Sequence, residues 1–176
     1  MPITIRNVNP DDADALAHVL ISAEQYTFRG LVPEQCLEFT EEESASNWKK
    51  SFSGDFPGEK DIFVVAETES KKVVGFAWGS PADSLPRYGS ELKMVSVLPD
   101  YHRQGIGRKL IAHIAVELSK QGIESMWLKV VQVNPNRRFY DRLGGTHIKT
   151  GIYLWDDVPV IECIYAWNDT TILNKK

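Results

Sequence analysis

The run VSVLPDYHRQGIGR, residues 95–108, joins an apolar β-rich segment to the start of an amphipathic helix. Gly105 and Gly107 have no side chains, so a ligand can approach the backbone closely at this junction. The first turn of the following helix carries unpaired N–H groups and the positive end of the helix dipole. Arg103 and Arg108 add positive charge at the same place. The junction is therefore predicted to bind an anion such as a phosphate.

The run also allows other interpretations. A plain strand–helix turn with solvated basic side chains has the same pattern, because a bare GxG motif is weakly specific. A Walker loop would need Gly-Lys-Ser/Thr, and this loop lacks that hydroxyl for Mg²⁺. A Rossmann fingerprint would need a third glycine, where this chain has Leu110. A pyrophosphate bound without a metal fits the run best.

Length and composition indicate one ordinary globular domain. The 176 residues carry a formal net charge of −4, which disfavours nucleic acid as a partner because nucleic-acid-binding domains are usually basic. The four histidines form no metal-ligand pattern, so no metal is expected, and Cys36 and Cys163 are expected to be reduced. The N-terminal residues lack the apolar core of a signal peptide, and no apolar run approaches membrane-spanning length. A cytoplasmic protein without a membrane partner is expected.

The order of predicted elements indicates a mixed α/β fold. Alternating β-rich patterns predict strands, and capped apolar patterns of helical period predict helices. The predicted elements are a strand at 3–6, helices after Asn9 and Thr40, a hairpin of 62–67 and 73–78, a strand at 92–98, a helix at 105–121, a strand at 126–131, a short helix at 135–143, and strands at 148–154 and 160–167. This order implies a central mixed sheet of about seven strands with helices on both faces. Residues 1–170 are expected to form the single domain and residues 171–176 a frayed tail.

Two further motifs accompany the glycine-rich junction. Residues 134–145, NPNRRFYDRLGG, place an asparagine before a helix that bears Phe-Tyr and ends in Leu-Gly-Gly. Residues 26–33, YTFRGLVP, contain the pattern Tyr-x-x-Arg-Gly-Leu-x-Pro. In this order the three motifs resemble those of the GNAT superfamily of acetyl-CoA-dependent N-acetyltransferases, and they span nearly the whole chain. The junction departs from the family pattern, Arg/Gln-x-x-Gly-x-Gly/Ala, by having His102 in its first position.

The resemblance implies acetyl-CoA as the cofactor. The backbone of residues 95–97 would hold the pantetheine arm in a splayed gap between two parallel strands, the glycine-rich loop would hold the pyrophosphate, and Asn134 would bond the pantetheine. The expected cofactor-binding residues are Val95, Ser96, Val97, Arg103, Gln104, Gly105, Ile106, Gly107, Arg108, Asn134 and Arg137. Val95 and Val97 would also suit a plain core, and Asn134 would suit a helix cap before a proline.

Acetyl transfer requires a neutral amine and a proton for the departing thiolate. By resemblance Tyr140 is the expected proton donor, although a packed aromatic with a satisfied hydroxyl would have the same sequence. Some family members carry a glutamate near the start of the fifth strand, where this chain has Lys129. Glu91 is the expected base, with a solvated strand-end carboxylate as an equal alternative, and Glu24 and Glu162 are more distant candidates.

The acceptor is the least determined part of the sequence interpretation. Tyr26, Phe28 and Tyr88 are expected to shape the acceptor pocket, on loops that flank the cofactor. The leading hypothesis is a small-molecule primary amine that attacks the thioester directly. A protein N-terminus or lysine would instead require an open groove between loops 26–33 and 80–89. A non-catalytic acyl-CoA-binding sensor is a third alternative, and both a monomer and a homodimer remain open.

Overall fold

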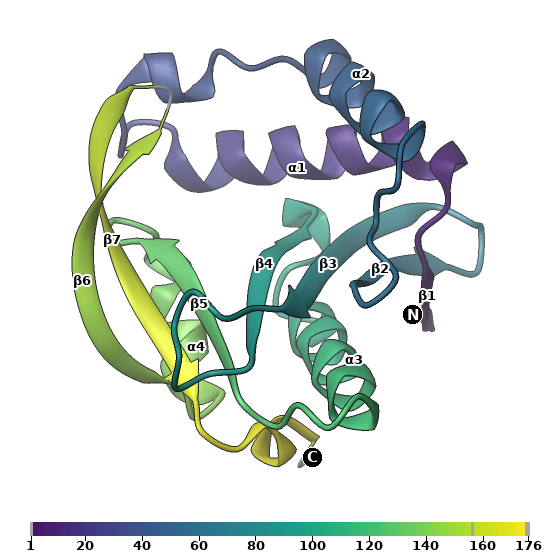
Figure 1. The fold of residues 1–176 in the computed structure, drawn as a ribbon. Helices are drawn as coiled ribbons and strands as arrows, with labels where there is room; N and C mark the ends of the chain where they lie inside the picture. Colours follow the sequence, from purple (N-terminus) through teal and green to yellow (C-terminus); the bar gives the residue numbers. More distant parts are fainter. Residues whose placement is uncertain (1, 156, 175–176) are drawn as a thin grey trace.

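A computed structural model describes residues 2–155 and 157–174, which form one seven-stranded sheet in the order β1-β2-β3-β4-β5-β7-β6 (Figure 1). The strands are β1 Ile3–Asn7, β2 Ile62–Thr68, β3 Val73–Pro81, β4 Ser90–Val97, β5 Met126–Val131, β6 Thr146–Trp155 and β7 Val158–Trp167. The α-helices are α1 Ala13–Phe28, α2 Glu41–Phe52, α3 Ile106–Lys120 and α4 Arg138–Arg142. Neighbouring strands are antiparallel except β4 and β5, which are parallel. The predicted mixed α/β fold with seven strands is confirmed.

The helices cover the sheet in two groups. In Figure 1, α1 and α2 lie together on one side of the first strands, and α3 lies on the other. The helix α3 buries its apolar stripe of Leu110, Ile111 and Ile114 against the sheet. A Cβ atom at Gly79 would collide with Ile114, so the glycine lets α3 pack closely against β3. The close contact matters for function because α3 begins at the glycine-rich loop.

Local capping determines where the first two helical segments begin. Asn9 accepts a hydrogen bond from the Asp11 N–H at 3.0 Å, and Asp12 accepts one from the Asn9 N–H at 2.9 Å. Thr40 and Glu43 form the same reciprocal pair before α2, with distances of 3.2 and 2.9 Å. These side chains satisfy N–H groups that have no partner within the helix. The predicted starts after Asn9 and Thr40 are confirmed.

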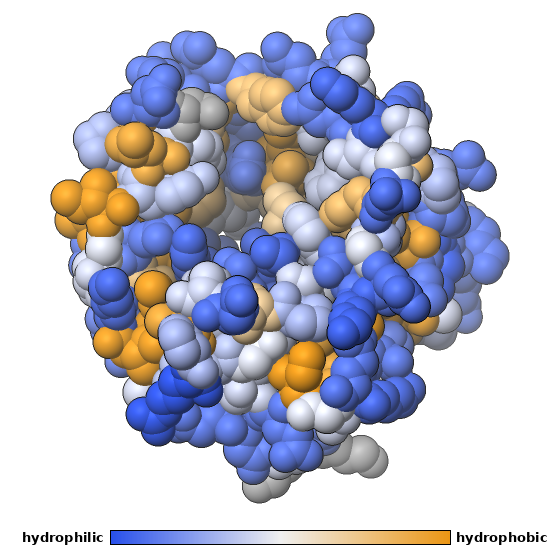
Figure 2. Space-filling view, viewed as in Figure 1, coloured by the Kyte–Doolittle hydropathy of each residue, from blue (hydrophilic) through white to orange (hydrophobic). Residues whose placement is uncertain are grey.

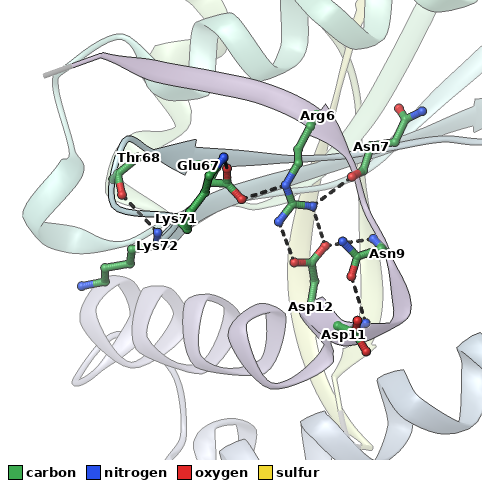
Figure 3. A network of polar contacts seen from close by, with 9 residues as sticks. All are labelled: Arg6, Asn7, Asn9, Asp11, Asp12, Glu67, Thr68, Lys71 and Lys72. Carbon is green, nitrogen blue, oxygen red and sulfur yellow. Dashed lines mark hydrogen bonds and ion pairs between the residues drawn. The ribbon is translucent and has the colours of Figure 1, made fainter.

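An ionic network ties β1, β2 and the start of α1 together (Figure 3). The Arg6 guanidinium donates two hydrogen bonds to Asp12 and one to Glu67, each of 2.8 Å. Lys71 donates to the other oxygen of Glu67 at 3.0 Å. The hydrogen bond from Arg6, followed by that from Lys71, holds the pKa of Glu67 below its usual value. The network therefore has a structural role.

The C-terminal segment differs from the prediction. Residues 171–174, expected to be part of a frayed tail, belong to the 3-10 helix Thr170–Asn174. Leu173 is buried in the main core, and the Thr170 N–H donates to the Glu124 carbonyl at 2.8 Å. The prediction is wrong for these residues because Ile172 and Leu173 provide apolar surface that docks beside α3. The last two residues of the predicted tail, 175 and 176, lie outside the described residues. Within residues 2–155 and 157–174, every helix is too short or too polar to cross a bilayer.

Candidate active site

The parallel strands β4 and β5 separate after a short seam. They are paired at Ser90 with Met126 and at Glu91 with Trp127. Among the described residues, none pairs as a strand with residues 92–97 on the β5 side of β4. Because backbone N–H and C=O groups need hydrogen-bond partners, this edge is available to a ligand. The splayed gap predicted from the resemblance is therefore present in the sheet.

A cavity of about 980 Å³ occupies this gap and extends beneath α1. In Figure 2 it is visible as a deep hollow near the middle of the face shown. The predicted site residues that line it are Tyr26, Phe28, Glu91, Val95, Ser96, Val97, Arg103, Gly105, Ile106, Gly107, Arg108, Asn134 and Tyr140. The fold thus brings together segments from α1, β4, the glycine-rich loop and α4. One cavity has room for both a cofactor arm and an acceptor, since small-molecule sites usually occupy about 300–1,000 Å³.

Three predicted site residues lie away from the cavity wall. The Gln104 side chain donates to the Asp100 carbonyl at 3.2 Å, and Arg137 donates to the Cys163 sulfur at 3.2 Å. Tyr88 is buried against Trp127 in a separate small cluster. Tyr88 does not line this cavity, because its loop packs on Trp127 of β5, and its role at the acceptor stays a prediction. We therefore expect Gln104 to contact the cofactor through its backbone atoms.

The glycine-rich loop has an unusual backbone. Arg103 and Gly105 both lie in the left-handed region, with φ of 58° and 78°. Gly105 is the N-cap of α3, and the first turn of that helix holds no acidic residue. Left-handed turns beside a helix N-terminus make anion-binding concavities of N–H groups. The loop therefore fits a pyrophosphate, and the strain at Arg103 is typical of a functional segment.

Tyr140 lies in the cavity wall on α4. Burial raises the pKa of its phenol to about 12, because the charged phenolate is poorly solvated there. Its ring packs against Tyr165 with the centroids 5.9 Å apart. The side chain therefore stays protonated at neutral pH and can donate a proton or a hydrogen bond into the cavity.

Three carboxylates line the same cavity, on three different elements. Glu91 of β4 lies 3.2 Å from the Lys93 ammonium, and Glu162 of β7 lies 3.9 Å from that of Lys129. Glu24 of α1 is the third. Glu162 appeared remote from the cofactor motifs in sequence, but antiparallel pairing with Val131 brings it to the gap. Glu162 directly precedes the buried Cys163, and neighbouring strand residues point to opposite faces of the sheet. This pattern was the signal in the sequence that Glu162 faces away from the core.

The β6–β7 hairpin forms a roof over the part of the cavity that lies next to the end of α1. Trp155, at the end of β6, contacts Phe28 of α1 with ring centroids 5.2 Å apart and planes at 86°. The Cys36 thiol also lies 3.9 Å from the Trp155 carbonyl. Trp155 and Tyr153 both line the cavity, and sequence analysis assigned neither to the site. The hairpin therefore forms the wall of the cavity that meets the end of α1.

Comparison with known proteins agrees with this geometry. A family model described as Acetyltransferase (GNAT) family matches residues 28–145. An uncharacterized N-acetyltransferase of Bacillus subtilis is 28% identical over 174 residues, which cover 97% of this chain and 96% of that protein. The structure of the ribosomal-protein-S18-alanine N-acetyltransferase from Escherichia coli aligns with a TM-score of 0.65 and 26% identity over 94% of this chain and 92% of that one. The paia N-acetyltransferase from Thermoplasma acidophilum, in complex with coenzyme A, aligns with a TM-score of 0.70 and 20% identity over 95% and 100%.

Proposed function

The chain belongs to the acetyltransferase (GNAT) family and uses acetyl-CoA, and from that premise we propose that it acetylates the primary amine of a small molecule by direct attack. The observation that carries this proposal is the contact between Phe28 and Trp155, which joins the end of α1 to the end of β6 in the cavity wall. We infer that this contact narrows the space along which a polypeptide acceptor would have to extend. An enclosed pocket favours a compact acceptor, whereas a peptide would need a groove open at both ends.

Acetyl-CoA supplies the activated acetyl group. Residues 95–97 would hold its pantetheine arm along the unpaired edge of β4, with Asn134 across the gap. The N–H groups of the glycine-rich loop, with Arg103 and Arg108, would hold the pyrophosphate. The unpaired strand edge and the left-handed loop both support this placement.

The remaining chemistry is proton transfer by this chain's own residues. The acceptor amine attacks the thioester carbonyl carbon, the C–S bond breaks, and the sulfur leaves as a thiolate. The acylated nitrogen loses its second proton, which restores the phenol that protonates the sulfur. We assign Tyr140 to protonate that sulfur, because its phenol lies in the cavity and retains its proton at neutral pH. We assign Glu91 to accept the proton of the incoming ammonium, directly or through water.

A protein N-terminus is the second candidate acceptor. It is favoured by the similarity to the ribosomal-protein-S18-alanine enzyme over nearly the full chain. A peptide substrate would require the β6–β7 hairpin to move away from α1. The two candidates therefore differ in whether the contact between Phe28 and Trp155 persists during turnover.

A thiol-release screen with acetyl-CoA tests the proposal. The panel would contain polyamines, amino acids and aminoglycosides beside peptides that begin with alanine or serine, at equal concentrations. We expect kcat/KM for the best small amine to exceed that for every peptide by at least about tenfold. Preference for a peptide would replace the proposal with the second candidate. Absence of turnover together with tight acetyl-CoA binding would favour a sensor.

A further inference from the structure

Two lysine–glutamate pairs line the cavity, one on each side of the gap between β4 and β5. On β4, the Lys93 ammonium lies 3.2 Å from the Glu91 carboxylate. On the other side, the Lys129 ammonium of β5 lies 3.9 Å from the Glu162 carboxylate of β7. All four residues line the cavity. Its wall therefore offers an acceptor both positive and negative groups.

Strand register places Lys129 and Glu91 on the same face of the sheet. Glu91 is the parallel partner of Trp127, and Lys129 follows two residues further along β5. Paired residues on neighbouring strands share a face of the sheet, and so do residues two apart on one strand. The Lys129 ammonium lies 5.7 Å from the centroid of the Trp127 ring, which agrees with this placement. The Glu91 and Lys129 side chains thus flank the point where the gap begins.

The start of the gap is also where an acceptor would meet the acetyl group. The glycine-rich loop follows the last residue of β4, at the opposite end of the strand from the paired residues Ser90 and Glu91. A cofactor arm that runs along β4 from this loop directs its thioester towards Glu91. This step rests on the proposed function, in which acetyl-CoA binds along β4. Glu91 and Lys129 would then both lie beside the acceptor.

The two ammonium groups differ in how far their partners satisfy them. Lys93 donates a hydrogen bond to Glu91 and lies over the Trp78 ring. Lys129 is too far from Glu162 for a hydrogen bond, and within the described part of the chain its ammonium has no hydrogen-bond acceptor. The Lys129 side chain is also 45% exposed. Lys129 can therefore donate to an anionic group of a ligand without first losing a hydrogen bond.

We propose that the acceptor is a zwitterion, an amino acid whose carboxylate is bound by Lys129 while its amine lies towards Glu91. Because one ammonium is available, the anionic group that it matches carries a single charge, as a carboxylate does. A phosphate monoester carries about −1.5 to −2 near pH 7 and would exceed it. A polyamine would bring only positive charge to carboxylates that already have lysine partners. Lys129 is thus a specificity-determining residue of the acceptor site.

Matched acceptors test this on the unaltered protein. Each amino acid would be compared with its carboxamide, which is uncharged at that group, and with the amine that lacks the group, such as cadaverine for lysine. Rates would be compared per concentration of unprotonated amine, because removal of the carboxylate changes the pKa of the amine. We expect kcat/KM for the best amino acid to exceed both analogues by at least about tenfold, the size of one hydrogen bond between charged groups. Equal or faster turnover of either analogue would overturn the proposal.

Variants of Lys129 test its part in this preference. Lys129→Met keeps most of the side-chain length and removes the charge, so KM should rise about tenfold for the amino acid and change less than about twofold for the decarboxylated amine. Lys129→Arg should retain most of the affinity, because a guanidinium also binds a carboxylate. Lys120→Met is the matched control, since its ion pair with Glu117 lies on α3 outside the cavity wall. Equal effects of Lys129→Met on both acceptors would indicate a structural role and overturn the assignment.

The proposed function and this inference fail in different ways. If peptides are acetylated and no small amine is, the proposed function fails and the inference fails with it. If small amines are acetylated but a carboxylate gives them no advantage, only the inference fails. An advantage of the carboxylate that disappears in Lys129→Met and persists in Lys120→Met would support both.

Discussion

Phe28, the last residue of α1, and Trp155, the last residue of β6, meet edge to face with their ring centroids 5.2 Å apart. The two residues lie far apart in sequence, and their contact joins two walls of the cavity. The Trp155 carbonyl is held in the same place by Cys36. In the proposed function, the size limit for the acceptor would therefore be set where the C-terminal end of α1 meets the end of β6.

Replacing Trp155 by alanine should open this roof. We expect the KM for the best small amine to rise about tenfold, since an aromatic pair contributes about 0.5–1.5 kcal/mol beyond its buried area. The dissociation constant for acetyl-CoA should change less than about twofold. Ile152→Ala is the matched control, because Ile152 is on the same strand but is 78% exposed and outside the cavity wall. Steady-state kinetics with both substrates would check this, and an unchanged amine KM would contradict it.

Substitution of Tyr140 by phenylalanine should separate catalysis from binding. We expect kcat to fall about 100-fold, within the usual range for loss of a general acid, while acetyl-CoA affinity is nearly unchanged. Burial raises the pKa of this phenol to about 12, so the wild-type rate should not decline through its deprotonation between about pH 8 and 10. Tyr165→Phe serves as the control, because Tyr165 packs beside Tyr140 but lies outside the cavity wall. A full rate for Tyr140→Phe would remove it from the acid role.

The identity of the base can be tested by comparing two carboxylates. Glu91→Gln should lower kcat/KM about 100-fold near pH 7, because most of a primary amine is protonated there. Raising the pH towards about 10 should recover part of the rate, since more of the amine is then neutral. Glu162→Gln, on the opposite wall, should change the rate only a few-fold at each pH. The reverse pattern would transfer the role from Glu91 to Glu162.

Two glycines at opposite ends of α3 form a matched pair for testing the loop. Gly105 and Gly122 have φ of 78° and 80°, and a Cβ atom at either would meet nothing within 4 Å. Alanine should therefore cost each site about 1–2 kcal/mol of backbone strain and lower Tm by a few degrees. Only Gly105→Ala should also weaken coenzyme A binding, because it moves the N–H groups of the pyrophosphate loop. Equal coenzyme A affinity in both variants would contradict the assignment.

The network around Arg6 predicts how stability depends on pH. The pKa of Glu67 is lowered in the folded state, chiefly by Arg6, so its contribution is present above its ordinary value near pH 4 and is lost as the pH falls through the lowered one. We expect Arg6→Met to lower Tm by about 5–10 °C at pH 7, with the difference from wild type shrinking below about pH 4. Lys49→Met is the control, because its ion pair with Asp14 is mostly exposed and should contribute little. Thermal melts across pH would check both variants, and a difference that grows in acid would contradict the prediction.

Features encoded by neighbouring residues were predictable from the sequence. The helix starts at Asn9 and Thr40 depend on side chains that bond backbone groups two or three residues away. The glycine-rich loop was predictable for the same reason, because its glycines and the helix that follows are contiguous. The gap itself was inferred only through the family resemblance. No local pattern in β4 indicates that its pairing with β5 ends at Glu91.

Features that depend on distant segments were missed or misplaced. Trp155 belongs to the site because a ten-residue strand returns across the molecule to reach α1. Tyr88 was predicted to shape the acceptor pocket. In the structure it is buried against the apolar surface of Trp127 on β5. Arg137 donates a hydrogen bond to the Cys163 sulfur on β7. This partner is 26 residues away, and no sequence motif indicates it. In each case the determining contact joins residues that the chain brings together only when the sheet is complete.

The short seam between β4 and β5 has a consequence for the sheet as a whole. Ser90 and Glu91 join a block of four strands to a block of three, and the rest of β4 faces open space on that side. The backbone there must satisfy its hydrogen bonds from solvent or from a ligand. In the proposed binding mode the cofactor arm takes the place of a missing strand, so part of the sheet would be supplied by a ligand that is exchanged with every turnover.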